Sequence, residues 1–402
     1  MIAVRFLVLA VGAALGVFHP FMAVILRGFG FSAGEIGVVA SLGAIGFTIA
    51  VPAWGHLADV RLGRPRTLQI CSIGAGLAIL ALLLPWPVVV VAALFGLFWI
   101  FESSWQPLAD AITVNALRGR DYGRVRLLTS LSFAAASIVA GFVYNETGYA
   151  AAFVLLALGA LAIALAAAWV PDVGRADLAA HAIRTGRASS TRTGSAGVAL
   201  RVAPKLWLVL LSVSLLFVGV IGSFTFLPLR LESLGGSPSD IALSSGGAAV
   251  AEIPTMLFAA HIARRIGLRG MFVGSALLYA SCLCAWIVAD APLAIVATRT
   301  LSGIGFAGVT VSVVLTIAAL LPADLQATGQ SLFQTTAFGM AAIVANVIGG
   351  ILYDSLGHVA VFGLAALMAL AAAALGWFAF PTRESPGPPI VSATGPSRLP
   401  LA

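Results

Sequence analysis

The chain has 402 residues, of which 60% are apolar and only 9% are charged. Soluble domains carry roughly 25% charged residues, so this composition excludes a water-soluble protein of this size. Fifteen acidic and 22 basic residues cannot coat such a body, whereas a lipid bilayer suits the apolar excess. We therefore expect a multi-pass membrane protein.

Apolar segments that can cross a bilayer follow one another along the chain. A spanning helix needs about 20 mainly apolar residues. The first segment is interpreted as a span, not a signal peptide, because it stays apolar to Leu26 without a small-residue cleavage site. The twelve predicted spans cover residues 3–25, 35–56, 67–84, 88–113, 124–145, 149–170, 205–229, 239–261, 270–288, 291–320, 326–353 and 358–380.

The basic residues predict the orientation of these spans. With the N-terminus in the cytoplasm, 19 of the 22 Lys and Arg residues fall in cytoplasmic segments, Arg27 and Arg230 fall outside, and Arg299 falls within a span. This bias follows the positive-inside rule, so the charge of +7 indicates topology and does not call for nucleic acid. We expect the plasma (inner) membrane of a bacterium, with both termini cytoplasmic.

The two halves of the chain resemble each other. Residues 32–36 recur at 237–241, Pro52 recurs as Pro254, and residues 141–148 recur at 350–357. The offsets between the copies run from 202 to 209 residues. Six spans per half give both copies one orientation, which is the parallel-repeat plan of one class of transporter. We predict an all-α integral membrane fold of twelve helices. Its parts are an N-terminal six-helix half (1–170), a cytoplasmic linker (171–204), a C-terminal six-helix half (205–380) and a disordered cytoplasmic tail (381–402).

One sequence pattern lies between the second and third predicted spans. It comprises Gly55, Asp59, Arg61, Gly63 and Arg64. This pattern resembles the loop 2–3 motif of the major facilitator superfamily, with one residue inserted before Gly63. The resemblance implies a transporter that works by alternating access. It also implies a cytoplasmic gating latch, in which the acid and the arginines pair with helix ends of the opposite half.

A second stretch narrows the resemblance. Residues 107–111 and 121–130 are similar to the phenylpropionate permeases, and more distantly to the lactose permease and nucleoside symporter groups. The resemblance implies that Asp110 and Arg126 bind the substrate. It also implies that Phe133, seven residues after Arg126, stacks on the substrate.

A polar stripe runs through the fourth predicted span. Ionisable groups inside a span commonly cost about 2.5 kcal/mol or more, so each one indicates a function. Glu102, Gln106 and Asp110 are spaced four residues apart and therefore share one face of a helix. We predict that Glu102, Gln106 and the adjacent Trp105 line the substrate site.

The second half holds two further ionisable groups within spans. Glu252 lies near the middle of the eighth span and matches a buried carboxylate of the lactose permease group, and Arg299 can approach it. Ser302 and Gly305 stand where lactose permease has its proton-coupling His and Glu, so that relay is not implied. We predict that Glu252, partnered by Arg299, is the leading proton carrier, followed by Glu102. A permanent salt bridge is the structural alternative.

The sequence thus predicts a secondary transporter of a small organic solute with proton symport. The resemblance favours an aromatic monocarboxylate as substrate; proton-driven efflux of hydrophobic compounds and sugar or nucleoside symport are the alternatives. His19 and Asn346 are interpreted as helix-packing residues. We expect a monomer in the bilayer that binds its solute and protons, without nucleic acid, cofactor or metal. A membrane-embedded sensor and a membrane enzyme fit less well, since the chain shows neither a large soluble appendage nor a reactive constellation.

Overall fold

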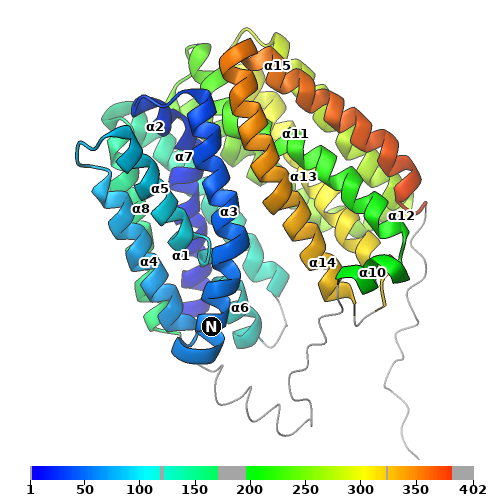
Figure 1. The fold of residues 1–402 in the computed structure, drawn as a ribbon, viewed down its shortest axis with the longest axis horizontal. Coiled ribbons are helices and arrows are strands. Elements are labelled where there is room, and N and C mark those ends of the chain that lie inside the picture. Colours follow the sequence, from blue (N-terminus) through cyan, green and yellow to red (C-terminus); the bar gives the residue numbers. More distant parts are fainter. Residues whose placement is uncertain (1, 118–121, 171–195, 323–324, 383–402) are drawn as a thin grey trace, which may run out of the picture.

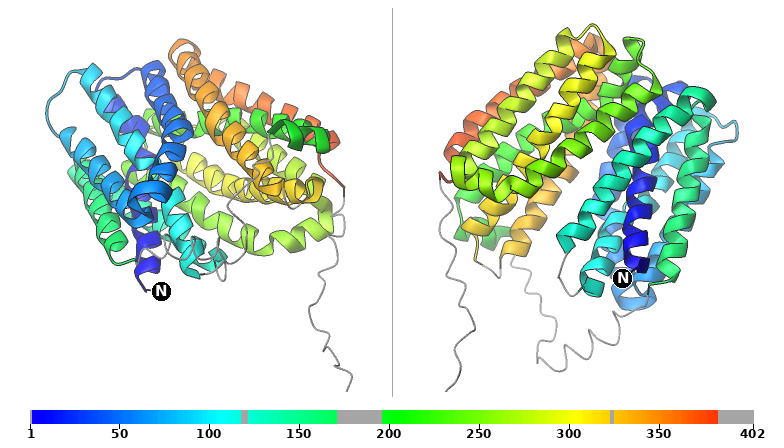
Figure 2. Two further views of the ribbon diagram at one scale, coloured as in Figure 1. Left: turned by 60° about the horizontal axis from the view of Figure 1, so that its bottom comes forward. Right: turned by 180° about the vertical axis from the view of Figure 1, so that it is seen from behind.

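The computed structural model describes residues 2–117, 122–170, 196–322 and 325–382, and these residues form helices joined by short turns. The helices before residue 170 lie on one side of the molecule and those after residue 195 on the other (Figures 1 and 2). We call these two sets the N-terminal group and the C-terminal group. The N-terminal group comprises α1 (Ile2–Phe18), η1 (His19–Phe21), α2 (Met22–Gly28), α3 (Ala33–Leu57), η2 (Ala58–Leu62), α4 (Arg64–Ala81), α5 (Val88–Glu102), α6 (Trp105–Leu117), α7 (Tyr122–Thr147) and α8 (Ala150–Ala168). The C-terminal group comprises α10 (Ala196–Val202), α11 (Lys205–Ser233), α12 (Pro238–Val288), α13 (Pro292–Leu320), α14 (Gln326–Gln334), η3 (Thr335–Met340) and α15 (Ala341–Ala379).

Ten helical segments in the described residues are long and apolar enough to cross a bilayer. The sequence predicted twelve, and two segments account for the difference. The predicted span 67–84 forms α4, which is not among the ten; it has 18 residues and begins with Arg64 and Arg66. The predicted spans 326–353 and 358–380 belong to one apolar run, Thr328–Ala379, in which the chain turns at Gly357.

Glycines with a positive φ angle mark equivalent turns in the two groups. An L side chain rarely adopts this conformation, so glycine allows a sharp turn at each position. The three pairs are Gly30 with Gly235, Gly63 with Gly267, and Gly148 with Gly357. Their separations of 204 to 209 residues agree with the offset between the sequence repeats.

The two groups approach each other closely at two crossings. Where α3 crosses α15, the backbone of Asn346 leaves no room for a side chain at Gly37. Where α7 crosses α12, the side chain of Ala242 and the backbone of Pro238 leave no room for a side chain at Gly141. Small residues let helices pack closely in a membrane. Both crossings lie toward the end of the molecule opposite the chain's N-terminus, here called the far end (Figure 1).

Candidate functional site

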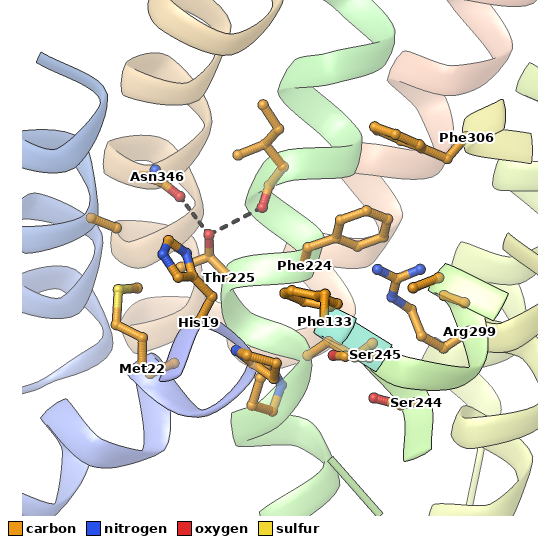
Figure 3. Close-up of a pocket in the computed structure, with 18 of the residues that line it drawn as sticks. His19, Met22, Phe133, Phe224, Thr225, Ser244, Ser245, Arg299, Phe306 and Asn346 are labelled. Atoms are coloured by element: carbon orange, nitrogen blue, oxygen red, sulfur yellow. Dashed lines mark hydrogen bonds between the residues drawn. The ribbon is translucent and has the colours of Figure 1, made fainter. Parts of the chain in front are cut away.

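A cavity of about 440 Å³ lies between the two groups of helices. This volume falls within the range of small-molecule sites. Figure 3 shows side chains from both groups projecting into it. Its polar and aromatic lining residues are His19, Trp99 and Phe133 from the N-terminal group, and Phe224, Thr225, Ser244, Ser245, Glu252, Arg299, Phe306 and Asn346 from the C-terminal group.

Arg299 of α13 is held against an aromatic ring in the cavity wall. Its Cζ atom lies 3.7 Å from the centre of the Phe224 ring, which is a cation–π contact. Its Nη1 atom donates a hydrogen bond to Oγ of Ser302 at 2.9 Å. The guanidinium is thus fixed in orientation by α11 and by its own helix.

Glu252 of α12 lines the same cavity and lies within electrostatic range of Arg299. The ion pairs within 4.0 Å in the described part of the chain do not include these two side chains. The carboxylate and the guanidinium thus line one cavity and interact electrostatically without a direct ion pair. The sequence placed both residues near one another in the second half, and the structure brings both into the cavity wall.

A polar bridge joins two helices of the C-terminal group at the cavity. Oγ1 of Thr225 in α11 donates a hydrogen bond to Oδ1 of Asn346 in α15 at 2.7 Å (Figure 3). Asn346 is only 4% exposed, so its amide is held firmly in place. From the sequence, Asn346 is interpreted as a residue that bridges helices. In the structure it joins α15 to α11 and also forms part of the cavity wall.

His19 is a cavity residue that sequence reasoning assigned to packing. Its Nε2 atom lies 3.2 Å from Oε1 of Glu102, and its ring meets Trp99 edge to face with the centroids 5.3 Å apart. Glu102 itself is buried and lies outside the cavity wall. The usable signal in the sequence was Pro20, because a proline after an intramembrane His indicates an interrupted helix that can line a cavity.

Comparison with known proteins identifies the family of this helical protein. Residues 2–364 match the model of a family described as MFS_1 like. The chain belongs to the MFS_1 like family. It is 28% identical over 362 residues to the maltose permease of Geobacillus stearothermophilus, covering 85% of this chain and 84% of the permease.

Two solved structures share the fold of this MFS protein. The D323A mutant of the nucleoside transporter NupG superposes with a TM-score of 0.80 at 15% identity, over 94% of this chain and 99% of that one. A D-xylose-proton symporter superposes with a TM-score of 0.66 at 16% identity, over 95% and 97% of the two chains. The protein is therefore a multi-pass membrane transporter of the MFS type, with bacterial relatives and a role in transport rather than catalysis.

The other predicted substrate residues of this MFS transporter occupy different places. Phe133 lines the cavity. Gln106 donates a hydrogen bond from Nε2 to Oδ1 of Asp110 at 2.9 Å, as their spacing predicts, and both lie outside the cavity wall. Trp105 is fully buried in the core and packs edge to face on Phe98. Arg126 lies within α7, but its side chain falls outside the described residues.

The predicted gating residues gather at the end of the molecule nearer the N-terminus. Gly55 is in the last turn of α3, Arg61 is in η2, and Gly63, with φ of +83°, directly precedes α4. Nε of Arg64 donates to Oδ1 of Asp59 at 3.1 Å, and Nη1 of Arg64 donates to the carbonyl of Ala111 at 3.4 Å. These contacts stay within the N-terminal group, whereas the resemblance implied partners in the opposite half.

Proposed function

We propose that this MFS transporter carries a neutral hydroxylated solute, a sugar or a nucleoside, together with protons. In this account its twelve spans form two six-helix halves that rock about the central cavity, which is the parallel-repeat form of alternating access. The observation that carries the proposal is the composition of the cavity wall. Aromatic rings from both groups surround hydroxyl and amide side chains there, and this combination suits a ring-shaped solute bearing hydroxyl groups.

The charges in the described part of the cavity favour a neutral solute over an anion. Arg299 is already engaged by Phe224 and Ser302 and interacts electrostatically with the carboxylate of Glu252. His19 is engaged by Glu102. Each basic side chain therefore has an acidic neighbour, and neither offers an unmatched positive charge to a carboxylate. The names of a maltose permease, a nucleoside transporter and a D-xylose-proton symporter among the similar proteins support the same substrate class.

Glu252 is the proposed proton carrier of the C-terminal group. A carboxyl group in an apolar cavity is costly when charged, and a positive neighbour offsets part of that cost. Arg299 supplies this neighbour without a direct contact. Protonation of Glu252 leaves Arg299 as an uncompensated charge, so binding of solute hydroxyl groups and binding of the proton influence each other.

The structure is closed at the far end, and we infer that it represents one end state of the transport cycle. Hydrogen bonds between the two groups lie on that side. The hydroxyls of Ser41 and Ser137 donate to the carbonyls of Ile343 and Ala242. The amides of Ala33 and Ser239 donate to the side chains of Asp354 and Asn145. If the N-terminus is cytoplasmic, as the Arg distribution predicts, this state faces inward. The gating pair Asp59–Arg64 then lies at the open side, ready to change partners when that side closes.

A binding screen tests the substrate class. Thermal unfolding of the purified protein is followed with maltose, D-xylose, uridine, 3-phenylpropionate and a lipophilic cation, because a ligand that binds the folded state raises its unfolding temperature. We expect a sugar or uridine to raise the unfolding temperature. This increase should be smaller in Phe133→Ala and unchanged in Glu146→Gln, a control that alters an exposed carboxylate. Stabilisation by 3-phenylpropionate alone would instead support the aromatic monocarboxylate that residues 107–130 imply, with Asp110 and Arg126 as its site. Stabilisation by the cation alone would support efflux.

A further inference from the structure

Two helix interruptions of the N-terminal group meet beside the cavity. α1 gives way to η1 at His19, where Pro20 has no backbone N–H to donate to the preceding turn. α5 ends at Glu102, and α6 begins after a two-residue turn, with Pro107 in its first turn. Interrupted helices are tolerated within a membrane where the chain lines a cavity or is buried in protein. The two breaks bring the side chains of His19 and Glu102 together.

His19 lines the cavity, whereas its partner Glu102 does not. Nε2 of His19 and Oε1 of Glu102 are 3.2 Å apart. The side chain of His19 is 35% exposed and lines the cavity, while that of Glu102 is 10% exposed and lies outside the cavity wall. Figure 3 shows the His19 ring in the cavity wall, with Thr225 and Asn346 near it in that view. Water or solute in the cavity therefore reaches His19 before it reaches Glu102.

We propose that His19 and Glu102 form a second proton-binding unit of this transporter, in which His19 exchanges the proton with the cavity and Glu102 stores it. This inference rests on the proton-coupled transport proposed above. A carboxyl group and an imidazole that share one proton carry no net charge, whether the proton sits on oxygen or on nitrogen. Loss of that proton leaves a net negative charge among apolar side chains, which is unfavourable.

The proton path uses both nitrogens of the ring. A proton from cavity water binds Nδ1 of His19, and the proton on Nε2 passes to Oε1 of Glu102. The reverse transfer returns one proton to water. Only N–H and O–H bonds form and break, and water is both the donor and the acceptor, so the step needs no other reactant.

Among the residues that the structure describes, few other charged or titratable groups lie near this pair. Glu252 and Arg299 line the same cavity from the C-terminal group. Tyr144 of α7 donates its hydroxyl to the carbonyl of Val17 at 2.7 Å, beside the break in α1. Asp110 of α6 lies eight residues after Glu102 in the sequence and accepts a hydrogen bond from Gln106. The two groups of helices thus each contribute one carboxylate with a basic neighbour, which gives two separate sites for protons.

The transport test separates proton coupling from solute binding. Purified full-length protein is placed in liposomes with a trapped pH dye, and labelled maltose is the solute. Counterflow of maltose needs no net proton movement, whereas a maltose gradient moves protons only if the two are coupled. His19→Gln and Glu102→Gln are compared with wild type and with His261→Gln, a matched change of an exposed His on α12.

The expected result is a selective loss of protons. Counterflow in Glu102→Gln, whose side chain lies outside the cavity wall, stays within about threefold of wild type. In both variants the number of protons moved per maltose falls to about half, since one of two sites is lost. His261→Gln changes neither quantity. An unchanged ratio in both variants would overturn the proposal. So would loss of counterflow together with proton movement in Glu102→Gln, because that result assigns the pair a structural role.

A second measurement needs no solute. Infrared spectra of the same liposomes at stepped pH report the carbonyl band of protonated carboxyl groups. We expect one band of a protonated carboxyl group to vanish in Glu102→Gln and to change in intensity in His19→Gln. A spectrum that neither variant alters would overturn the dyad. Absence of maltose counterflow in wild type would instead show that maltose is not the solute. The infrared spectra then test the proton-binding role of His19 and Glu102 by themselves.

Discussion

The carboxylate of Asp354 accepts hydrogen bonds from the backbone amides of Ala33 and Gly34, at 2.8 and 2.6 Å. Asp354 belongs to α15 of the C-terminal group, and the two amides belong to the first turn of α3 in the N-terminal group. The first amides of a helix have no partner within the helix and carry the positive end of its dipole. A negative side chain from one group therefore caps a helix of the other group at the far end.

The internal repeat places a related contact on the other side of the molecule. Asn145 of α7 occupies the position that corresponds to Asp354. Its Oδ1 accepts from the amide of Ser239 at 3.2 Å, and its Nδ2 donates to Oγ of Ser239 at 3.0 Å, at the start of α12. One contact is charged and the other is neutral, so the two sides of the far end are held with different strength.

Asp354→Asn should weaken closure of the far end. Loss of the charge at the start of α3 removes about 0.5 to 1 kcal/mol, which changes the ratio of open to closed molecules two- to fivefold. Distances between spin labels on the two groups at the far end report this ratio. Asp290→Asn is the control, because it neutralises an exposed carboxylate in the turn between α12 and α13. An unchanged distance distribution in Asp354→Asn would show that the contact does not hold the far end closed.

The same contact predicts the pH range of closure. Asp354 lies between the predicted spans 326–353 and 358–380. Partial burial opposes its charge, but hydrogen bonds from Gly34, Ser32 and Ala33 outweigh that effect and hold the pKa of Asp354 below its ordinary value of 3.8. A carboxylate with a lowered pKa stabilises the closed state above the ordinary value, and this stabilisation is lost as the pH falls through the lowered one. Spin-label distances at the far end should therefore show no contribution from Asp354 to pH dependence between about pH 5 and 8.

Gly37→Ala should also favour opening of the far end, for a steric reason. A methyl group at Gly37 collides with the carbonyl of Asn346, so α3 and α15 cannot approach as closely. Overpacking of this kind typically costs about 1 to 3 kcal/mol. Gly28→Ala is the matched control, because the space beside Gly28 is open. Equal spin-label distances in the two variants would contradict the close crossing.

Charge matching between Arg299 and Glu252 predicts the behaviour of a double variant. Arg299→Ala leaves the Glu252 carboxylate in the cavity without its positive neighbour and lowers the unfolding temperature of the purified protein. Adding Glu252→Gln removes the unmatched charge and should restore about 1 kcal/mol of stability in a double-mutant cycle. Strictly additive effects of the two substitutions would show that the two charges do not interact.

Substitution by phenylalanine should have different effects at two neighbouring tryptophans. Trp99 lines the cavity, so Trp99→Phe should weaken solute binding. Trp105 is fully buried, so Trp105→Phe should leave a void that costs about 1 to 2 kcal/mol of stability. Solute titration and thermal unfolding of both variants measure the two effects. A larger loss of binding in Trp105→Phe would restore Trp105 to the proposed substrate site.

The helical fold and the repeat were accessible from sequence because lipid imposes long apolar segments, and because turn residues such as Gly30 and Gly235 recur at one offset. Periodicity also predicted the Gln106–Asp110 contact, since it lies within one helix. Periodicity could not show that Trp99 and not Trp105 lines the cavity. Both groups of helices form the cavity, so its lining depends on how helices distant in sequence are oriented. The His19–Glu102 pair spans 83 residues and arises from two helix breaks, which no local pattern specifies.

Solute-driven proton movement tests the central claim most directly. Wild-type protein and Glu252→Gln are placed in liposomes with a trapped pH dye, and maltose, D-xylose and uridine are added outside in turn. We expect acidification of the lumen with at least one of these solutes, reduced to about half in Glu252→Gln and unaffected in Glu146→Gln. Exchange of labelled solute without any change of lumen pH in the wild type would contradict proton symport and leave a transporter driven by the solute gradient alone.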